Sequence, residues 1–544
     1  MPFISPHQML LDSGKKRGKK VFLHQPIGKG YRLTTWADAY QQVMSMVSYL
    51  VKFPKGSKIG IYSLNCDRWI MADLAIMIAG HVSVPIYPTA SARTISFIEK
   101  HAELKLVFIG KLNEAIPKGA FTSQIEKVSI FTQDSDLPFW NDIINQNSPA
   151  KSIVMPDPLD VATIVYTSGT TGESKGVVIS YLALYNAFES IRNTFNVSSE
   201  ERFFSYLPLA HVAERVAVEM GAVFYGASIY FVEKLDTFAE NLRFAQPSIF
   251  FGVPRIWLKL KQNIESRLGG ERILSLLLNL PVMGIWLKKK IVAKLGLENA
   301  WLCLSGAASI SKEVIEWYEE LGIVIYEVYG MSETLGIATA NAVGKRKVGT
   351  VGKPLHNCKI LIADNQEILL QVPSMMKEYY KLPELTQAAI QDDWFRTGDL
   401  GAVDEEGYLR ITGRAKDLFK TSKGKYIAPT PIEQNLASLF KCDNVCVMGE
   451  GLAQPVAIVS MQATTLSQTK KNGKQIASKL NLLNQQLEKH EKLGFLGLTS
   501  EEWNSDNELL TPTLKIRRQA VETYYKADVA KLMKSGKRWG ILEK

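Results

Sequence analysis

The chain has 544 residues, of which 46% are hydrophobic and 22% are charged, and its formal net charge is +10. This composition excludes a disordered or fibrous chain, and the length suffices for two or three domains. Its five cysteines are odd in number and lack a framework spacing, which excludes a disulfide scaffold and indicates a reduced compartment.

The first 110 residues alternate between helical and strand patterns. Apolar residues recur at helical spacing over 35–52, and 69–78 reads as an apolar helix. Short apolar runs predict strands at 57–62, 82–87 and 104–109, with a helical segment at 92–101 before the last of them. Such alternation predicts a parallel sheet flanked by helices.

A loop rich in glycine and hydroxyl residues follows a predicted buried strand at 161–165 and precedes another at 177–179. Glycines allow a sharp turn that exposes backbone N–H groups, hydroxyls add donors, and a lysine adds charge. This inventory suits a polyphosphate, although the spacing differs from the Walker motif. A surface hairpin is the alternative interpretation. The residues concerned are Ser168, Gly169, Thr170, Thr171, Gly172, Lys175 and Gly176.

Strands continue through the middle of the chain, and each runs into a loop marked by glycine or proline. In parallel sheets ligands bind at the carboxyl ends of strands, so these loops are candidate site positions. The strands are expected at 203–204, 228–232, 248–253, 301–304 and 323–327.

One apolar stretch, 273–287, interrupts this series and is followed by Lys288, Lys289 and Lys290. It contains Asn279 and Pro281 and is shorter than the roughly 18 uninterrupted apolar residues of a membrane span. The pattern favours a buried helix pair. The alternative is docking on an anionic bilayer surface, with the lysines on lipid headgroups.

The pattern of predicted elements changes after about residue 348, where shorter strands at 359–362 and 367–371 indicate a twisted antiparallel subdomain. It changes again at 413–417, beyond which the chain is polar and rich in helix-forming residues at 466–492. We therefore predict a large domain, 1–412, that includes a barrel-like subdomain at about 345–412, then a hinge at 413–417 and a small domain at 418–544.

The positive charge favours acidic ligands such as nucleotides, coenzyme phosphates or anionic lipid. The basic residues are dispersed and match no nucleic-acid-binding module, so we expect no nucleic-acid partner. The basic run at 15–20 follows the apolar part of the amino terminus, the wrong order for a secretory signal. We expect a cytoplasmic protein, with peripheral contact to the inner face of a membrane as an open alternative.

Four further polar clusters lie at strand ends or turns, at 326–334, 392–400, 413–417 and 510–518. Together with the loop at 166–176, and in this order, they resemble the motif set of the adenylate-forming (AMP-binding) superfamily over about residues 20–525. Within it the chain looks like a long-chain fatty-acid–CoA ligase, because of the segments 207–215, 252–257, 427–433 and 511–515. The resemblance implies an α/β fold: a large domain of flanked parallel sheets, a β-barrel-like subdomain and a small mobile α+β carboxyl-terminal domain.

The resemblance also implies how ATP is held. The loop residues, namely Thr167, Ser168, Gly169, Thr170, Thr171, Gly172 and Lys175, would bind the β- and γ-phosphates. Thr334 would contact the α-phosphate, and Glu333 would hold Mg²⁺, with Thr170 as a second ligand. A helix-capping role is the plain alternative for Glu333.

For the nucleoside, Tyr329 would stack on adenine and Glu327 would accept from its amine. Asp399 would bind the ribose hydroxyls, and Arg414 would complete that clamp. The alternative for Tyr329 is a side chain packed in the core, and the alternative for Asp399 is a solvated side chain in a turn. The expected remainder of the pocket wall is Gly306, Ala307 and Gly330.

The resemblance makes Lys515 a catalytic residue that enters from the small domain and neutralises charge on the α-phosphate and the carboxylate. His211 would orient the carboxylate at the end of the acyl tunnel and would not act as a base, since a fatty acid is already ionised at neutral pH. Lys416 occupies the hinge position, where few backbone torsions need to change before coenzyme A reacts. Without the resemblance, Lys515 and Lys416 would be interpreted as solvated lysines and His211 as a histidine packed in the core.

The expected activity is ATP-dependent conversion of a long-chain fatty acid to acyl-AMP and then to acyl-CoA, with release of pyrophosphate and AMP. The rivals are a ligase that loads a carrier protein and a catalytically silent nucleotide-binding protein at membranes. Glu173 and Ser174 stand where a proline is usual, and Val372 and Glu378 replace glycines. Acyl chain length and oligomeric state stay open.

Overall fold

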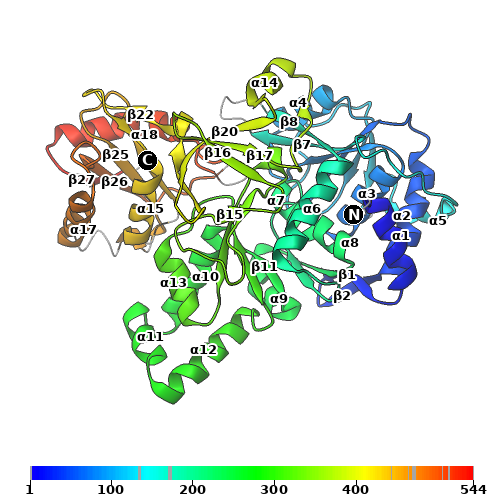
Figure 1. Cartoon of the computed structure of the whole chain (residues 1–544), viewed down its shortest axis with the longest axis horizontal. Helices are drawn as coiled ribbons and strands as arrows, with labels where there is room; N and C mark the ends of the chain where they lie inside the picture. Colours follow the sequence, from blue (N-terminus) through cyan, green and yellow to red (C-terminus); the bar gives the residue numbers. More distant parts are fainter. Residues whose placement is uncertain are drawn as a thin grey trace.

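The computed structural model describes residues 3–132, 136–168, 174–440, 442, 444–463, 465–467, 473–504, 507–511 and 515–542. Five residues of the predicted phosphate loop, 169–173, lie outside the described residues, and they include Gly169, Thr170, Thr171 and Gly172. The chain forms two large sheets flanked by helices, a smaller antiparallel sheet and a carboxyl-terminal region (Figure 1).

The first large sheet has seven strands in the order β18-β8-β7-β4-β3-β5-β6. Its pairs from β7 to β6 are parallel, whereas β8 and β18 extend it antiparallel. Its elements are β3 (Lys58–Tyr62), β4 (Val82–Ile86), β5 (Leu106–Ile109), β6 (Glu126–Ser129), β7 (Val161–Ser168), β8 (Ser174–Ser180) and β18 (Glu378–Tyr379), with α2 (Trp36–Leu50), α3 (Asp67–Ile78), α4 (Ala92–Ala102), α5 (Trp140–Gln146) and α6 (Tyr181–Phe195).

The second large sheet has nine strands in the order β15-β14-β13-β12-β11-β9-β10-β1-β2. Its centre, from β13 to β1, is parallel. Its strands are β1 (Val21–Ile27), β2 (Gly30–Thr35), β9 (Arg202–Ser205), β10 (Ser228–Phe231), β11 (Ile249–Phe251), β12 (Leu302–Ser305), β13 (Ile325–Tyr329), β14 (Thr339–Ala340) and β15 (Lys353–Pro354). The accompanying helices are α1 (Pro6–Lys16), α7 (Val212–Glu214), α8 (Gly221–Tyr225), α9 (Phe238–Ala245), α10 (Pro254–Arg267) and α13 (Lys312–Glu320).

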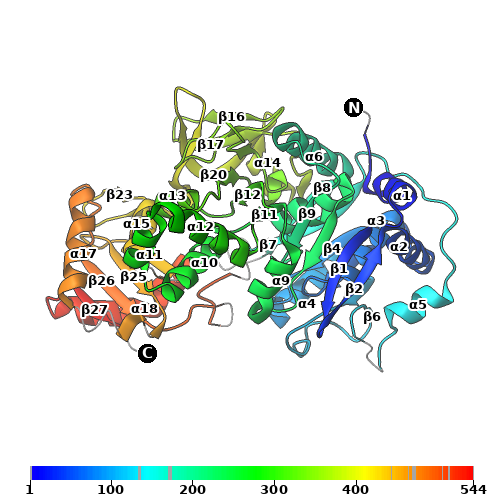
Figure 2. The same ribbon diagram turned by 90° about the horizontal axis from the view of Figure 1, so that it is seen from below.

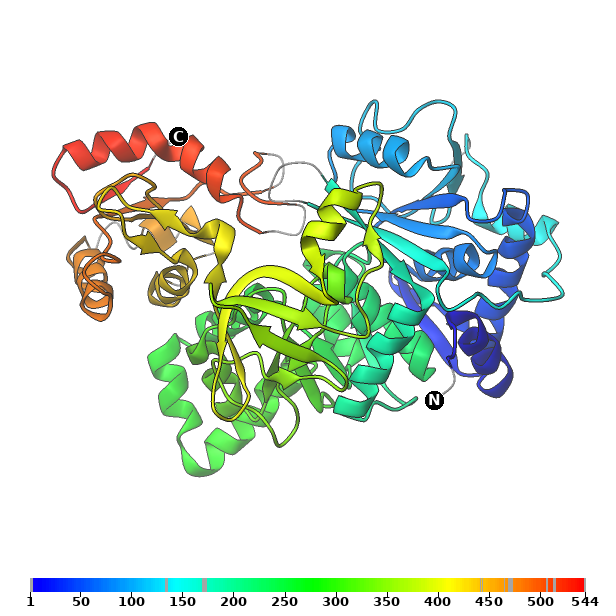
Figure 3. The same ribbon diagram turned by 45° about the horizontal axis from the view of Figure 1, so that its top comes forward.

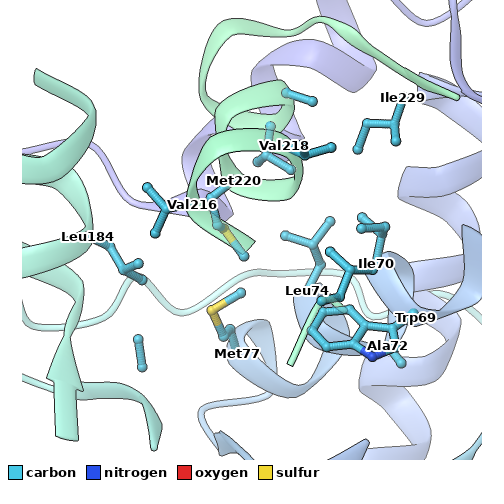
Figure 4. Close-up of a cluster of buried hydrophobic side chains, with 14 of the residues drawn as sticks. Trp69, Ile70, Ala72, Leu74, Met77, Leu184, Val216, Val218, Met220 and Ile229 are labelled. Atoms are coloured by element: carbon cyan, nitrogen blue, oxygen red, sulfur yellow. The ribbon is translucent and has the colours of Figure 1, made fainter. Parts of the chain in front are cut away.

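Helix α3 is the centre of the main core. All twelve of its residues are buried, which explains why its sequence is apolar nearly all round and not amphipathic. Figure 4 shows its Trp69, Ile70 and Leu74 close to Val218 and Met220, which belong to the π-helix η1 (Arg215–Met220). Burying one such side chain contributes about 1.5–3 kcal/mol.

A charged pair lies inside this core. Arg215 Nη2 donates to both carboxylate oxygens of Asp73, at 2.6 and 2.7 Å, and both side chains are buried. The Asp73 carboxylate also accepts from the Ser83 hydroxyl, and Arg215 donates to the Thr163 hydroxyl. The π-helix is thereby tied to α3 and to strands β4 and β7.

The predicted antiparallel subdomain is present as a five-stranded sheet with the order β16-β17-β20-β19 and β21 paired to β20. It consists of β16 (Lys359–Ile362), β17 (Glu367–Gln371), β19 (Ile390–Gln391), β20 (Trp394–Val403) and β21 (Leu409–Arg414), with α14 (Pro383–Ala389) beside it. Strand β21 ends directly before the turn η4 (Ala415–Asp417), within the expected hinge.

The carboxyl-terminal region has a four-stranded sheet and cores of its own, and lies at one end of the molecule (Figure 2). The order β24-β25-β26-β27 is antiparallel at β24 and parallel thereafter. The elements are β22 (Phe419–Lys420), β23 (Tyr426–Ile427), α15 (Pro429–Phe440), β24 (Asn444–Met448), β25 (Val456–Ser460), α17 (Gly473–Gln486), β26 (Phe495–Thr499), α18 (Arg518–Lys534) and β27 (Trp539–Ile541). The α/β fold expected from the sequence is confirmed.

The stretch at 273–287 forms a helix pair, α11 (Glu271–Leu278) and α12 (Pro281–Leu295), which projects from the molecule (Figure 1). The expectation that this pair is buried is wrong, because most of its apolar side chains, including Leu276, Val282 and Trp286, are exposed. The pair extends beyond the edge of the large sheets (Figure 1), so in the described part of the chain these side chains have little packed over them. Within the described ranges, no helix is long and apolar enough to cross a membrane.

The buried ion pair between Asp73 and Arg215 gives a prediction about stability. Arg215→Met keeps an apolar stem but leaves Asp73 without its cation, so we expect a loss of about 3–5 kcal/mol. Calorimetry should show a lower melting temperature, whereas Arg410→Met, at an exposed position, should change it little. Equal melting temperatures for the two variants would contradict the structural role of the pair.

Candidate functional site

A cavity of about 3580 Å³ lies between the large sheets, the antiparallel subdomain and the carboxyl-terminal region. It brings together predicted site residues that are up to 348 positions apart, from Thr167 to Lys515. Figure 3 shows the segment before α18 extending from the carboxyl-terminal region toward the large sheets. The predicted site residues on its wall are Thr167, His211, Ala307, Tyr329, Gly330, Glu333, Asp399, Arg414, Lys416 and Lys515.

Asp399 is held in place on this wall by two neighbouring side chains. Arg414 Nε donates to Asp399 Oδ1 at 2.6 Å, and the Tyr329 hydroxyl donates to Oδ2 at 2.8 Å. Strand pairing places Asp399 directly opposite Arg414. Each carboxylate oxygen has further lone pairs, so the fixed Asp399 can also accept from two neighbouring hydroxyl groups of a ligand.

A second polar group surrounds Glu333, which follows β13 in the turn η3 (Ser332–Thr334). The Tyr379 hydroxyl donates to Glu333 Oε1 at 2.8 Å, and Lys175 Nζ lies 5.1 Å from the centre of the Tyr379 ring. Burial and the charge of Lys416 lower the pKa of Lys175, while Glu333 opposes the shift. Lys175, Lys416 and Glu333 are therefore close enough to influence one another electrostatically, and of the three Lys175 does not line the cavity.

The residues present fit a magnesium ion. In the part of the chain that the structure describes, no three His, Cys, Asp or Glu side chains form a metal cage. Mg²⁺ commonly binds one or two carboxylates and takes its other ligands from phosphates and water. Glu333, partly exposed on the cavity wall, matches that requirement. The other expected ligand, Thr170, is outside the described residues.

His211 lies where β9 leads into α7, and its Nδ1 accepts the N–H of Ala213 at 3.1 Å. Burial, helped by the charge of Lys515, lowers the pKa of His211 to about 4. The ring is therefore neutral at pH 7. Because Nδ1 is an acceptor, the hydrogen is on Nε2, where it can be donated to an anion in the cavity.

Two residues hold the loop before His211 and have no role in the expectations from sequence. Asn65 donates to Ser205 Oγ at 2.8 Å and to the Leu207 carbonyl at 2.6 Å, and accepts the N–H of Leu209 at 3.0 Å. Glu214 accepts the N–H of Tyr206 at 2.8 Å. The available signal for Asn65 is its place just after the predicted strand at 57–62, at the carboxyl end of a parallel strand.

Lys515 approaches from the carboxyl-terminal region. Its N–H donates to Thr511 Oγ1 at 3.0 Å and its carbonyl accepts the Thr511 N–H at 2.8 Å, so the backbones of these two residues are held together. Loss of solvent and the charge of Arg414 lower the pKa of Lys515, while Asp399 and Glu333 oppose the shift. The lysine is thus within electrostatic reach of the residues that form both polar groups.

Some predicted residues do not reach the cavity wall. The Glu327 carboxylate is buried and accepts the N–H of Gly349, and burial raises its pKa to about 7. The Thr334 hydroxyl is buried and accepts the N–H of Met331 at 3.1 Å. Gly306 packs against Val328 so closely that a Cβ would lie 2.8 Å from Val328 Cγ2. Their expected contacts with ATP stay predictions.

Apolar side chains line another part of the same cavity. They come from α6, from the π-helix and from the central strands of the nine-stranded sheet. These residues are Phe188, Ile191, Phe195, Phe203, Val216, Val218, Ile249 and Leu302. We call this part the apolar arm. The cavity therefore combines a polar region suited to a polyanion with a region suited to a hydrocarbon chain.

Comparison with known families gives two matches. A family model described as "AMP-binding enzyme" matches residues 10–380, and one described as "AMP-binding enzyme C-terminal domain" matches residues 416–536. Among curated proteins, the chain is 27% identical over 551 residues to the long-chain-fatty-acid–CoA ligase FadD15 of Mycobacterium bovis, covering 91% of each chain. It is 28% identical over 601 residues to long chain acyl-CoA synthetase 6, peroxisomal, of Arabidopsis thaliana, covering 96% of this chain and 84% of the relative.

Among solved structures, the chain is similar to the adenylation domain of a carboxylate reductase from Mycobacterium chelonae. The TM-score is 0.82 at 17% sequence identity, and the match covers 98% of this chain and 92% of that one. At this identity the likeness shows the fold alone.

Glu214 gives a prediction about pH. Burial raises the pKa of Glu214 from its ordinary 4.5 to about 8, so the folded protein keeps a proton that the unfolded chain has lost. Stability then falls as the pH rises from about 5 to 8. Glu214→Gln removes this titration, so its melting temperature should rise relative to wild type as the pH increases. The control is Glu384→Gln, at an exposed position, whose melting temperature should differ from that of wild type by the same amount at every pH. If the difference between Glu214→Gln and wild type is also independent of pH, the raised pKa of Glu214 is refuted.

Proposed function

We propose that this chain, which belongs to the family of AMP-binding enzymes, activates a long-chain fatty acid with ATP and transfers the acyl group to coenzyme A. The observation that carries the proposal is the presence of Lys515, His211 and the Asp399–Arg414 pair on the wall of one cavity that also has an apolar arm. The names of the relatives support the fatty acid and the coenzyme.

In the first step a carboxylate oxygen attacks the α-phosphorus of ATP, the bond from that phosphorus to the β-phosphate oxygen breaks, and pyrophosphate leaves. Both reactants are anions. Lys515 reduces their repulsion, and His211 Nε2–H, neutral at pH 7, orients the carboxylate without removing a proton. Mg²⁺ held by Glu333 would add positive charge beside the phosphates. Asp399 and Arg414 position the ribose.

In the second step the sulfur of coenzyme A attacks the acyl carbon, the bond to AMP breaks, and the thiol proton passes to solvent. Lys515 has completed its role by then and would withdraw. Lys416 lies in η4, between β21 and the carboxyl-terminal sheet, where a few torsions suffice for such a movement. A carrier-protein thiol is the alternative acceptor, and comparing it directly with coenzyme A separates the two.

The apolar arm is the reason for proposing a long acyl chain. Each methylene transferred from water to an apolar wall contributes about 0.8 kcal/mol. A small aryl acid would leave most of the arm empty and gain little from it.

Lys515→Ala tests the first step. We expect fatty-acid-dependent exchange of pyrophosphate into ATP to fall by about 10²–10³, because an electrostatic stabiliser of the transition state is lost. Conversion of supplied acyl-AMP to acyl-CoA should be nearly unchanged. Lys531→Ala, an exposed lysine on α18, is the matched control. Undiminished exchange in Lys515→Ala would remove the catalytic assignment.

Gly221 tests the apolar arm. It lies on the cavity wall, and a Cβ there would be 3.3 Å from the Val216 carbonyl oxygen and 3.7 Å from the Phe203 ring. We expect Gly221→Met to narrow the arm and lower kcat/KM for palmitate relative to octanoate by roughly 10–100-fold, equivalent to about two or three methylenes. Gly30→Met, in open space on β2, should leave the ratio unchanged. An unchanged ratio in Gly221→Met would place the acyl chain elsewhere.

A further inference from the structure

The helix pair α11 and α12, which we call the α11–α12 hairpin, is attached to the molecule along one side only. Leu274, Leu278, Ile291 and Leu295 are buried in the core that includes α9 and α10. The rest of the hairpin projects away from the sheets (Figures 1 and 3). It therefore has one face that holds it in place and one that is free.

The free face is apolar. The side chains of Leu276, Val282, Ile285 and Trp286 are 72%, 83%, 62% and 58% exposed. Ile273, Leu280 and Met283 are exposed beside them. Soluble proteins rarely present so many neighbouring large apolar side chains unless the surface binds a partner.

The hairpin is strongly basic, and its one acidic residue is Glu271, the first residue of α11. Residues 272–297 contain Arg272 and four lysines but no acidic residue. Lys288, Lys289 and Lys290 directly follow the apolar end of α12, and Lys290 Nζ lies 4.4 Å from the centre of the Trp286 ring. In the described part of the chain, no carboxylate pairs with these three lysines or with Lys294.

Apolar side chains beside unpaired lysines suit a surface that offers hydrocarbon and anions together. Tryptophan is favoured at the boundary between acyl chains and headgroups, and lysines bind anionic headgroups. A second copy of this chain on the same face would bring equal positive charges together. With 8 and 15 residues, the helices are too short to span a bilayer, so they would lie within its surface.

We propose that the α11–α12 hairpin docks the protein on the headgroup surface of an anionic lipid bilayer. The apolar side chains enter the boundary region, and Lys288, Lys289 and Lys290 contact lipid phosphates. The cavity wall reaches Gly270 and Glu271 at the base of the hairpin. If the proposed function holds, docking places the enzyme where its water-insoluble substrate is concentrated; the docking itself does not depend on that function.

Vesicle sedimentation with the full-length protein, without substrates, tests the proposal. We expect binding to vesicles of phosphatidylcholine with phosphatidylglycerol and much weaker binding to pure phosphatidylcholine. Ile285→Ser/Trp286→Ser should weaken binding to the anionic vesicles at least about tenfold, because it removes apolar contacts. Lys288→Glu/Lys289→Glu/Lys290→Glu should weaken it at least as much and abolish its dependence on salt.

Matched variants keep the test specific. Lys531→Glu/Lys534→Glu/Lys537→Glu makes the same charge change at exposed positions on and after α18, and Val154→Ser/Leu235→Ser removes side chains that are 74% and 80% exposed elsewhere. Both should bind like wild type. Circular dichroism and melting temperature verify folding of every variant.

Three results would overturn the proposal. They are no binding of wild type to anionic vesicles, equal loss of binding in the charge control, or hairpin variants that convert a dimer to a monomer in analytical ultracentrifugation without changing vesicle binding. Loss of pyrophosphate exchange with intact vesicle binding would count against the proposed function and leave the docking surface standing.

Discussion

The hydrogen bonds that Asp399 accepts from Tyr329 and Arg414 join two parts of the molecule on which the site depends and lie next to the turn that leads to the third. Tyr329 ends a strand of the nine-stranded sheet, whereas Asp399 and Arg414 both belong to the antiparallel subdomain, and Arg414 is the last residue before the turn that leads to the carboxyl-terminal region. Because the carboxylate accepts from Tyr329, the subdomain cannot shift relative to the nine-stranded sheet without breaking a buried, charge-assisted contact. Lys515 can act at the site only if it lies close to the Asp399 carboxylate and its two partners.

The electrostatics of the cavity are those of a site prepared for an anion. Lys175 and Lys515 both have a lowered pKa, the first because of burial and Lys416, the second because of loss of solvent and Arg414. Placing cations together in a partly desolvated space costs free energy, and a bound polyphosphate would reverse both effects. The neutral His211 ring adds a hydrogen-bond donor without adding to the repulsion between these cations. The same residues that are unfavourable together in the free protein therefore favour an anionic ligand bound between them.

The apolar parts of the molecule serve two different purposes. Around α3, apolar side chains are packed on every side, and the Asp73–Arg215 pair fixes the π-helix that forms one wall of the apolar arm. On the α11–α12 hairpin, apolar side chains of the same types are exposed beside lysines. The difference lies in what surrounds them, since a membrane surface and a protein core both remove such side chains from water.

The sequence by itself determined the order of helices and strands, the place of each polar motif at a strand end, and the family resemblance. It did so because periodicity and turn residues are local: the helix expected at 35–52 is Trp36–Leu50, and the strand expected at 82–87 is Val82–Ile86. Only the tertiary structure decided which side chains meet. It paired Asp73 with Arg215 and Tyr379 with Glu333, turned Glu327 toward Gly349, and left 273–287 exposed. Those outcomes depend on neighbours that are distant in the chain, and an apolar pattern specifies that a face must be covered without specifying what covers it.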